Sequence, residues 1–186
     1  MEYGFSTMGY EIAGGMGVAM AEPERRIYVM VGDGSYLMLA NEIATAYQEG
    51  ISMTIVVLDN HGFRCIRNLS GACGGTNAFN DFRVREASTG GFTGEVLPID
   101  FAANAGSLGA AVLTADSPAE LKAALVEARS IEGRPAVIVV EIEPEPAVPA
   151  YDSWWDVPVA EVSTSPRVQT ARKEYEANLA KERSFV

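Results

Sequence analysis

The amino-acid sequence predicts an α/β fold with a doubly wound, mostly parallel sheet and helices on both of its faces. Apolar runs of strand length alternate with segments of helical periodicity, which is the pattern of a parallel sheet covered on both sides. In addition, 48% of the 186 residues are hydrophobic, which is enough to bury one substantial core. We therefore expect one sheet-based domain followed by a tail.

The first third of the sequence has the order helix, strand, turn, helix, strand. The glycine-rich turn separates a buried strand from apolar residues at helical spacing, and a second buried strand follows. The predicted segments are Met8–Ala21, Arg26–Val31, Gly32–Gly34, Tyr36–Gln48 and Met53–Leu58. This order describes a βαβ unit, so both strands should end at the same edge of the sheet.

The stretch His61–Val96 breaks the regular pattern. It is rich in Gly, Asn, Ser, Thr and Arg, and it is too long for an ordinary connection, so we expect an irregular segment that serves a site or an interface. Regular elements then resume as helix, strand, helix, strand and terminal helix: Asp100–Ser107, Ala110–Thr114, a helix capped by Ser117, Ala136–Ile142 and Arg167–Arg183. The predicted domain covers residues 1–146, and the tail with its helix covers residues 147–186.

Composition excludes several classes of partner. The net charge of −11 argues against binding to nucleic acid or to an anionic membrane surface, because an acidic field repels phosphates. Apolar runs such as Ala136–Val140 are too short to span a bilayer. The two cysteines, Cys65 and Cys73, are too few for a disulfide framework, and the expected location is the cytoplasm.

Two polar positions point to a metal site. Asp33 follows the first strand, and Asn60 follows the second, with 25 residues between Gly34 and Asn60. If the strands are adjacent and parallel, both side chains reach the carboxyl edge of the sheet, where open α/β sheets bind ligands. The Asp33 carboxylate, the Asn60 amide oxygen and the Gly62 carbonyl would suit Mg²⁺, which prefers oxygen ligands.

The start of the second helix points to phosphate. Gly34 and Ser35 would offer backbone N–H groups and a hydroxyl to phosphate oxygens held by the same Mg²⁺. A Gly-Asp-Gly sequence can also be an ordinary loop, and only the paired spacing with Asn60 favours a site. Competing motifs, namely the P-loop, the dinucleotide-binding Gly-x-Gly-x-x-Gly and the EF-hand, do not occur at these positions.

These motifs resemble those of the thiamine-diphosphate enzymes that include acetolactate synthase and pyruvate decarboxylase. In that family, Gly-Asp-Gly and an Asn at about this spacing hold Mg²⁺ and the cofactor diphosphate, on a thiamine-diphosphate-binding fold. The resemblance extends upstream to Tyr3–Gly9. It implies that Ser6 and Met8 offer a backbone carbonyl and N–H to the aminopyrimidine ring, and that Met8 bends the cofactor. Asp59, where the family commonly has Asn, has no predicted role.

Further segments resemble the trihydroxycyclohexane-1,2-dione hydrolases of myo-inositol catabolism: Tyr3–Leu39, Leu58–Phe63, Pro98–Ala105 and Tyr151–Trp155. The resemblance implies hydrolytic cleavage of a carbon–carbon bond in a cyclic dione to give 5-deoxyglucuronate. It also implies a homo-oligomer in which the activating glutamate lies on a separate pyrimidine-binding domain, usually of another subunit. No catalytic residue is then expected within this chain.

Three residues near the predicted metal site are candidates for substrate contacts. His61, Arg64 and Arg67 follow Asn60 closely, although the histidine can be structural and the arginines can pair with carboxylates. Two alternative functions stay open. An acetolactate synthase-like carboligase or decarboxylase would share every cofactor residue, and a non-catalytic α/β binding module would share the fold alone.

Overall fold

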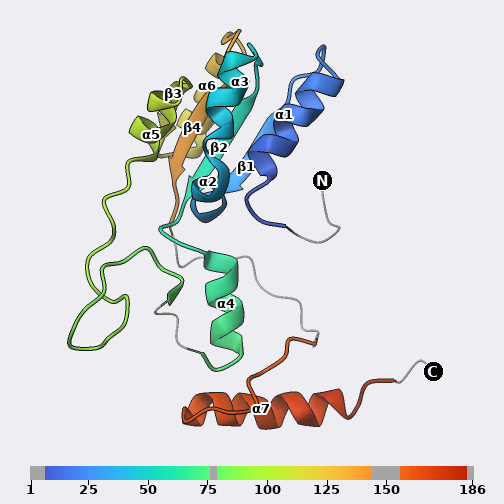
Figure 1. The fold of residues 1–186 in the computed structure, drawn as a ribbon, viewed down its shortest axis with the longest axis vertical. Coiled ribbons are helices and arrows are strands. Elements are labelled where there is room, and N and C mark those ends of the chain that lie inside the picture. Colours follow the sequence, from blue (N-terminus) through green and yellow to red (C-terminus); the bar gives the residue numbers. More distant parts are fainter. Residues whose placement is uncertain (1–6, 76–78, 144–155, 184–186) are drawn as a thin grey trace. The chain divides into compact units, whose positions relative to one another are not determined.

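The computed structural model describes residues 7–75, 79–143 and 156–183, which form two compact units (Figure 1). Met1–Gly62 and Pro98–Pro144 form the first, here called the sheet unit. Phe63–Leu97 and Glu145–Val186 form the second, here called the helical unit. The division predicted at residue 146 stays a prediction.

The sheet unit is built on a four-stranded parallel sheet in the order β1-β2-β4-β3. Its strands are β1 (Tyr28–Gly32), β2 (Thr54–Asp59), β3 (Ala111–Ala115) and β4 (Ala136–Glu141). All four predicted strands are present, each within two residues of its expected ends. The parallel pairing of β1 with β2 confirms that their carboxyl ends meet at one edge.

Helices cover both faces of this sheet, as predicted. Strand residues such as Ile55 and Val57 share one core with buried residues of four helices, α1 (Glu11–Ala21), α2 (Asp33–Leu39), α3 (Glu42–Gln48) and α5 (Phe101–Ser107). Residues of the opposite pleat, such as Val56 and Ile138, share a second core with α6 (Pro118–Ala128). The period-two alternation of the strands therefore separates two apolar layers.

The surface around β1 is less completely covered. Among the described strands, β1 pairs only with β2, and Tyr28 and Met30 are 43% and 69% exposed. Val18 and Met20 of α1 are also about half exposed. This part of the sheet unit presents apolar side chains on its surface.

Two predictions within the sheet unit need correction. The segment Tyr36–Gln48 is not one helix, because α2 ends at Leu39 and α3 begins at Glu42. Gly32–Gly34 is not a free turn either, since α2 begins at Asp33 directly after β1. The predicted cap is present, since the Ser117 hydroxyl accepts the Glu120 N–H. A second cap was not predicted: the Asp100 carboxylate accepts the Ala103 N–H at the start of α5.

The helical unit contains α4 (Arg64–Ala72) and α7 (Pro166–Leu179). The prediction of an irregular segment over His61–Val96 was therefore wrong for its first part. The helix was missed because its sequence is rich in polar residues. Two of its polar side chains, Arg64 and Arg67, lie one turn apart and face the same carboxylate, Asp81. Among the described helices of both units, none combines the length and hydropathy of a membrane span.

Candidate functional site

The carboxylate of Asp33 is the centre of a site at the carboxyl edge of β1 and β2. Its Oδ1 accepts the N–H of Gly34 at 2.8 Å. Its Oδ2 accepts the N–H groups of Asn60 at 3.1 Å and of Gly62 at 3.0 Å. Asp33 has 0% exposure, so these bonds hold a buried acidic group at the point where β1 becomes α2.

Burial raises the pKa of the Asp33 carboxyl group, because a buried carboxylate loses its hydration. The hydrogen bonds from Gly62, Gly34 and Asn60 oppose this shift, whereas a side-chain hydrogen bond with Asp59 adds to it. Among the described residues, the contacts of this carboxyl group are backbone N–H groups and a second acid, with no Lys or Arg side chain. The site therefore contains a buried acidic group whose described contacts are uncharged N–H donors and another acid.

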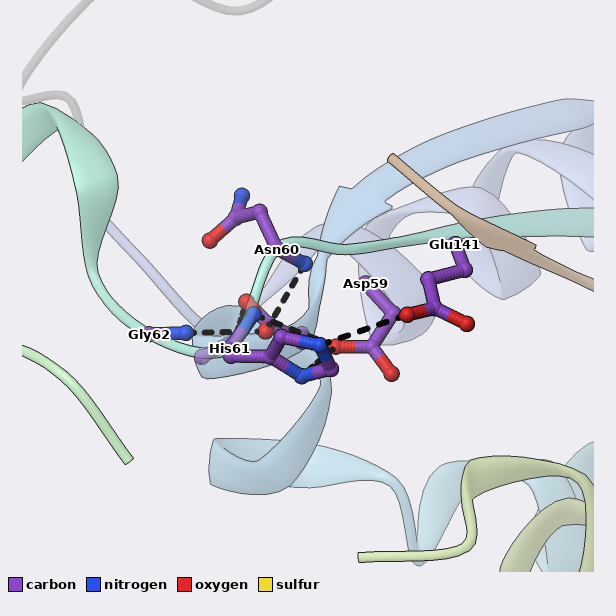
Figure 2. Close-up of polar contacts among 7 residues, drawn as sticks. Asp59, Asn60, His61, Gly62 and Glu141 are labelled. Carbon is purple, nitrogen blue, oxygen red and sulfur yellow. Dashed lines mark hydrogen bonds and ion pairs between the residues drawn. The ribbon is translucent and has the colours of Figure 1, made fainter. Parts of the chain in front are cut away.

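A second cluster joins the carboxyl ends of β2 and β4. Asp59 and Glu141 are register partners on these strands, and the His61 ring contacts the carboxylates of both (Figure 2). His61 Nδ1 is 3.1 Å from Asp59 Oδ1, and His61 Nε2 is 3.5 Å from Glu141 Oε1. The Asn60 amide points away from this ring, so Asn60 and His61 project from the same turn in different directions (Figure 2).

Comparison with known proteins identifies the family. The profile of the thiamine pyrophosphate enzyme family, C-terminal TPP binding domain, matches residues 1–140. This chain belongs to that family. Thiamine pyrophosphate is another name for thiamine diphosphate, and the matched residues include Asp33, Asn60 and Gly62 together with three whole strands and β4 except for its last residue, Glu141.

The chain is also similar to proteins named 3D-(3,5/4)-trihydroxycyclohexane-1,2-dione hydrolase. It is 41% identical over 185 residues to the protein of Geobacillus thermodenitrificans and 40% identical to that of Bacillus thuringiensis. A Bacillus cereus protein named as hydrolase 2 is 41% identical. Each match covers 100% of this chain but 29% of the relative, so the chain spans less than a third of the length of these relatives.

The donor set of this TPP binding domain fits a hard divalent cation. Asn60 and Gly62 direct their N–H groups to Asp33, and the turn that they form also carries an amide oxygen and a backbone carbonyl, which are ligand types that Mg²⁺ prefers. The described residues contain no group of three or more His, Cys, Asp or Glu side chains suited to a metal. A metal in this part of the chain would therefore need amide and carbonyl oxygens in addition to one carboxylate.

The residues expected to contact the cofactor are placed as follows. Gly34 and Ser35 are buried in the first turn of α2, and the Gly34 N–H is used by Asp33. Met8 is 39% exposed just before α1, and Ser6 lies outside the described residues. Their roles toward the cofactor stay predictions.

Arg64 and Arg67, the two other candidates for substrate contacts, belong to the helical unit. Arg64 Nη1 and Arg67 Nε lie 3.6 and 3.3 Å from Asp81 Oδ1, and all three side chains are less than a fifth exposed. Two guanidinium groups thus share one carboxylate. This arrangement favours a structural role of the arginines within the helical unit.

An acidic cleft of about 320 Å³ lies at the carboxyl ends of β2, β4 and β3. Its lining includes four acidic residues, Asp59, Asp100, Asp116 and Glu141. Such a surface repels a diphosphate.

Sequence reasoning missed two residues of the site, Asp59 and Glu141. Asp59 had no predicted role, and Glu141 was considered only as part of a strand. The signal for both was present, because polar residues at the carboxyl ends of adjacent parallel strands meet at the same edge. Glu141 ends the last strand, Ala136–Glu141, and therefore lies at the same edge of the sheet as Asp59.

Proposed function

We propose that this chain is the diphosphate-binding part of a longer thiamine-diphosphate enzyme, one that hydrolyses a carbon–carbon bond of 3D-(3,5/4)-trihydroxycyclohexane-1,2-dione to give 5-deoxyglucuronate in myo-inositol catabolism. The observation that carries the proposal is the convergence of Asp33, Asn60 and Gly62 at one sheet edge of a TPP binding domain. Identity of about 40% along the chain to hydrolases of this name supports the substrate.

In this proposal, Asp33, Asn60 and Gly62 bind Mg²⁺ with a carboxylate, an amide oxygen and a backbone carbonyl. Gly34 and Ser35 lie at the start of α2, where partial positive charge favours phosphate oxygens. Ser6 and Met8 orient the aminopyrimidine ring. When bound, the cofactor supplies the electron sink for carbon–carbon cleavage. Of the predicted substrate contacts, His61 lies beside the proposed metal ligands, whereas the pairing of Arg64 and Arg67 with Asp81 favours a structural role for the two arginines.

The proposal requires a partner domain. We expect the activating glutamate on a pyrimidine-binding domain, from a second subunit of a homo-oligomer, so the chain holds half of a site. The length of the relatives supports further domains, since the match covers 29% of each. Exposed apolar residues of β1 and α1, such as Met30, are the kind of surface that a larger assembly covers. The free thiols of Cys65 and Cys73 agree with a cytoplasmic enzyme.

Calorimetry with thiamine diphosphate, with and without Mg²⁺, tests the binding role. We expect Mg²⁺-dependent binding, and we expect Asp33→Ala to weaken it on the order of 100-fold because a ligand and its charge are lost. The matched control is Asp116→Ala, which removes an exposed acid at the same sheet edge and should leave the affinity unchanged. Binding by wild type that does not depend on Mg²⁺ or Asp33 would contradict the proposed site.

Activity tests the reaction. The complete enzyme should cleave the cyclic dione, whereas the 186-residue chain saturated with cofactor and Mg²⁺ should not, because proton transfer needs a group within reach of the reacting atoms. Turnover by this chain at the rate of the complete enzyme would require a base within it. Carboligation or decarboxylation of a 2-keto acid in place of dione cleavage would favour an acetolactate synthase-like enzyme. Absence of cofactor binding in both proteins would indicate a non-catalytic module.

A further inference from the structure

The turn that carries the proposed metal ligands has an unusual backbone conformation at His61. The N–H groups of Asn60 and Gly62 both reach Asp33 Oδ2, so the chain must reverse sharply between them. His61 achieves this with φ of 60°. It is the one residue other than glycine with positive φ within residues 7–75, 79–143 and 156–183. This left-handed region is unfavourable for a residue that has a Cβ atom.

The side chain of Asp59 makes the contacts that can hold His61 in this conformation. Asp59 Oδ1 accepts the backbone N–H of His61 at 3.2 Å. This hydrogen bond, from a side chain to the N–H two residues later, closes an Asx turn. The same oxygen lies 3.1 Å from His61 Nδ1 (Figure 2). One carboxylate oxygen therefore restrains both the backbone and the ring of His61.

Asp59 itself is anchored in the sheet. It is the last residue of β2, its carbonyl accepts the N–H of Ile142 at 2.9 Å, and it is 8% exposed. Glu141, by contrast, is 3.5 Å from the ring and its side chain is 71% exposed, so solvent weakens that contact. Asp33 holds the N–H groups on either side of His61, whereas the contacts to His61 itself come mainly from Asp59, which connects a strand to the turn.

We propose that Asp59 is a positioning residue, which holds His61 in the left-handed conformation and thereby orients Asn60 and Gly62 for the metal without binding the metal itself. The proposal rests on the proposed function of Asn60 and Gly62 as ligands. It gives a role to the position at which the sequence departs from the two asparagines common in the wider thiamine-diphosphate family. It also assigns His61 a conformational role in place of a substrate contact.

A rescue experiment separates this role from a direct contact with the metal. Asp59→Ala removes the acceptor and should weaken Mg²⁺-dependent binding of thiamine diphosphate about tenfold, as expected for loss of support for a strained backbone conformation. The double variant Asp59→Ala with His61→Gly should recover most of this loss, because glycine adopts positive φ without steric cost. Asp59→Asn, which keeps an acceptor oxygen but no charge, should bind within about threefold of wild type.

The same variants have a readout that needs no ligand. In the 186-residue chain without cofactor, hydrogen exchange at the amides of Asn60 and Gly62 should accelerate in Asp59→Ala and slow again in the double variant. Failure of His61→Gly to restore either protection or affinity would overturn the proposal and favour Asp59 as a ligand or a necessary charge. Unchanged exchange and affinity in Asp59→Ala would also overturn it. If wild type does not bind the cofactor at all, the proposed function fails, and the exchange measurements still decide the role of Asp59.

Discussion

The two units of this protein are stabilised in different ways. Both apolar cores lie in the sheet unit, where residues such as Ile55, Val57 and Ile138 have 0% exposure. In the helical unit, α4 and α7 contain no buried residue, and the described contacts are mostly polar or cationic, such as Arg172 with Glu176 and Arg85 over the Phe92 ring. The proposed metal ligands thus belong to the well-packed unit, where small displacements of the backbone are costly.

Substitution of one isoleucine in each unit tests this comparison most strongly. Ile55→Ala in β2 should lower the free energy of unfolding by about 2–5 kcal/mol, because it leaves a cavity in a close-packed core. Ile66→Ala in α4, where the residue is 43% exposed, is the matched control and should cost less than about 1 kcal/mol. Chemical denaturation of both variants measures the difference. Equal losses would mean that the helical unit also depends on a packed core.

Tyr36 differs from the other large core residues of the sheet unit, because its buried side chain carries a hydroxyl group that makes a hydrogen bond. Its hydroxyl donates to Asn104 Oδ1 at 2.8 Å, and burial raises the pKa of Tyr36 to about 12. The folded state retains the proton more strongly than the unfolded state, whose pKa is near 10. The stabilisation is therefore complete below pH 10 and is lost as the pH rises toward 12.

Tyr36→Phe should remove this part of the pH dependence. Between pH 9 and pH 12, the free energy of unfolding of wild type should fall more steeply than that of the variant, by up to ~3 kcal/mol. Urea denaturation at several pH values provides the measurement, with Tyr47→Phe as a control at a tyrosine that is 49% exposed. Parallel pH curves for wild type and Tyr36→Phe would show that the buried hydroxyl does not contribute.

In the helical unit, the carboxylate shared by Arg64 and Arg67 should matter more than any single apolar side chain. Asp81→Ala removes the acceptor of both guanidinium groups and should lower the local stability of α4 by about 1 kcal/mol. Hydrogen exchange of the α4 amides detects this change, and Glu132→Ala, at an exposed residue of the sheet unit, is the control. Unaltered exchange in α4 would indicate that apolar contacts hold this helix.

Sequence patterns predicted the sheet unit well because its strands and helices bury apolar side chains at regular intervals along the chain. Apolar runs of strand length predicted the strands, the order of strands and helices predicted their parallel direction, and the N-cap signal at Ser117 predicted the start of α6. The convergence of Asp33 and Asn60 followed from the same strand geometry. Their roles as metal ligands are not tested by the geometry and stay predictions.

The remaining features depend on partners that local sequence does not reveal. Helix α4 was missed because its arginines face Asp81, which lies more than ten residues away along the chain. The break between α2 and α3 is set by packing against the sheet, and no glycine or proline marks it. The backbone conformation of His61 was also not predicted, because the hydrogen bonds from Asn60 and Gly62 that flank it go to Asp33, more than 25 residues earlier in the chain.

The strand order has a consequence for when the site forms. β4 pairs with β2 although β3 precedes it in the chain, so the contact of His61 with Glu141 joins residues 80 positions apart, with Phe63–Leu97 of the helical unit and the strand β3 between them in the sequence. Contacts of such high sequence separation form only after large loops have closed, which makes them slow to appear during folding. A growing polypeptide cannot complete this edge until Ala136–Glu141 has been synthesised. The contact between His61 and Glu141 can therefore form only after the last strand of the sheet is in place.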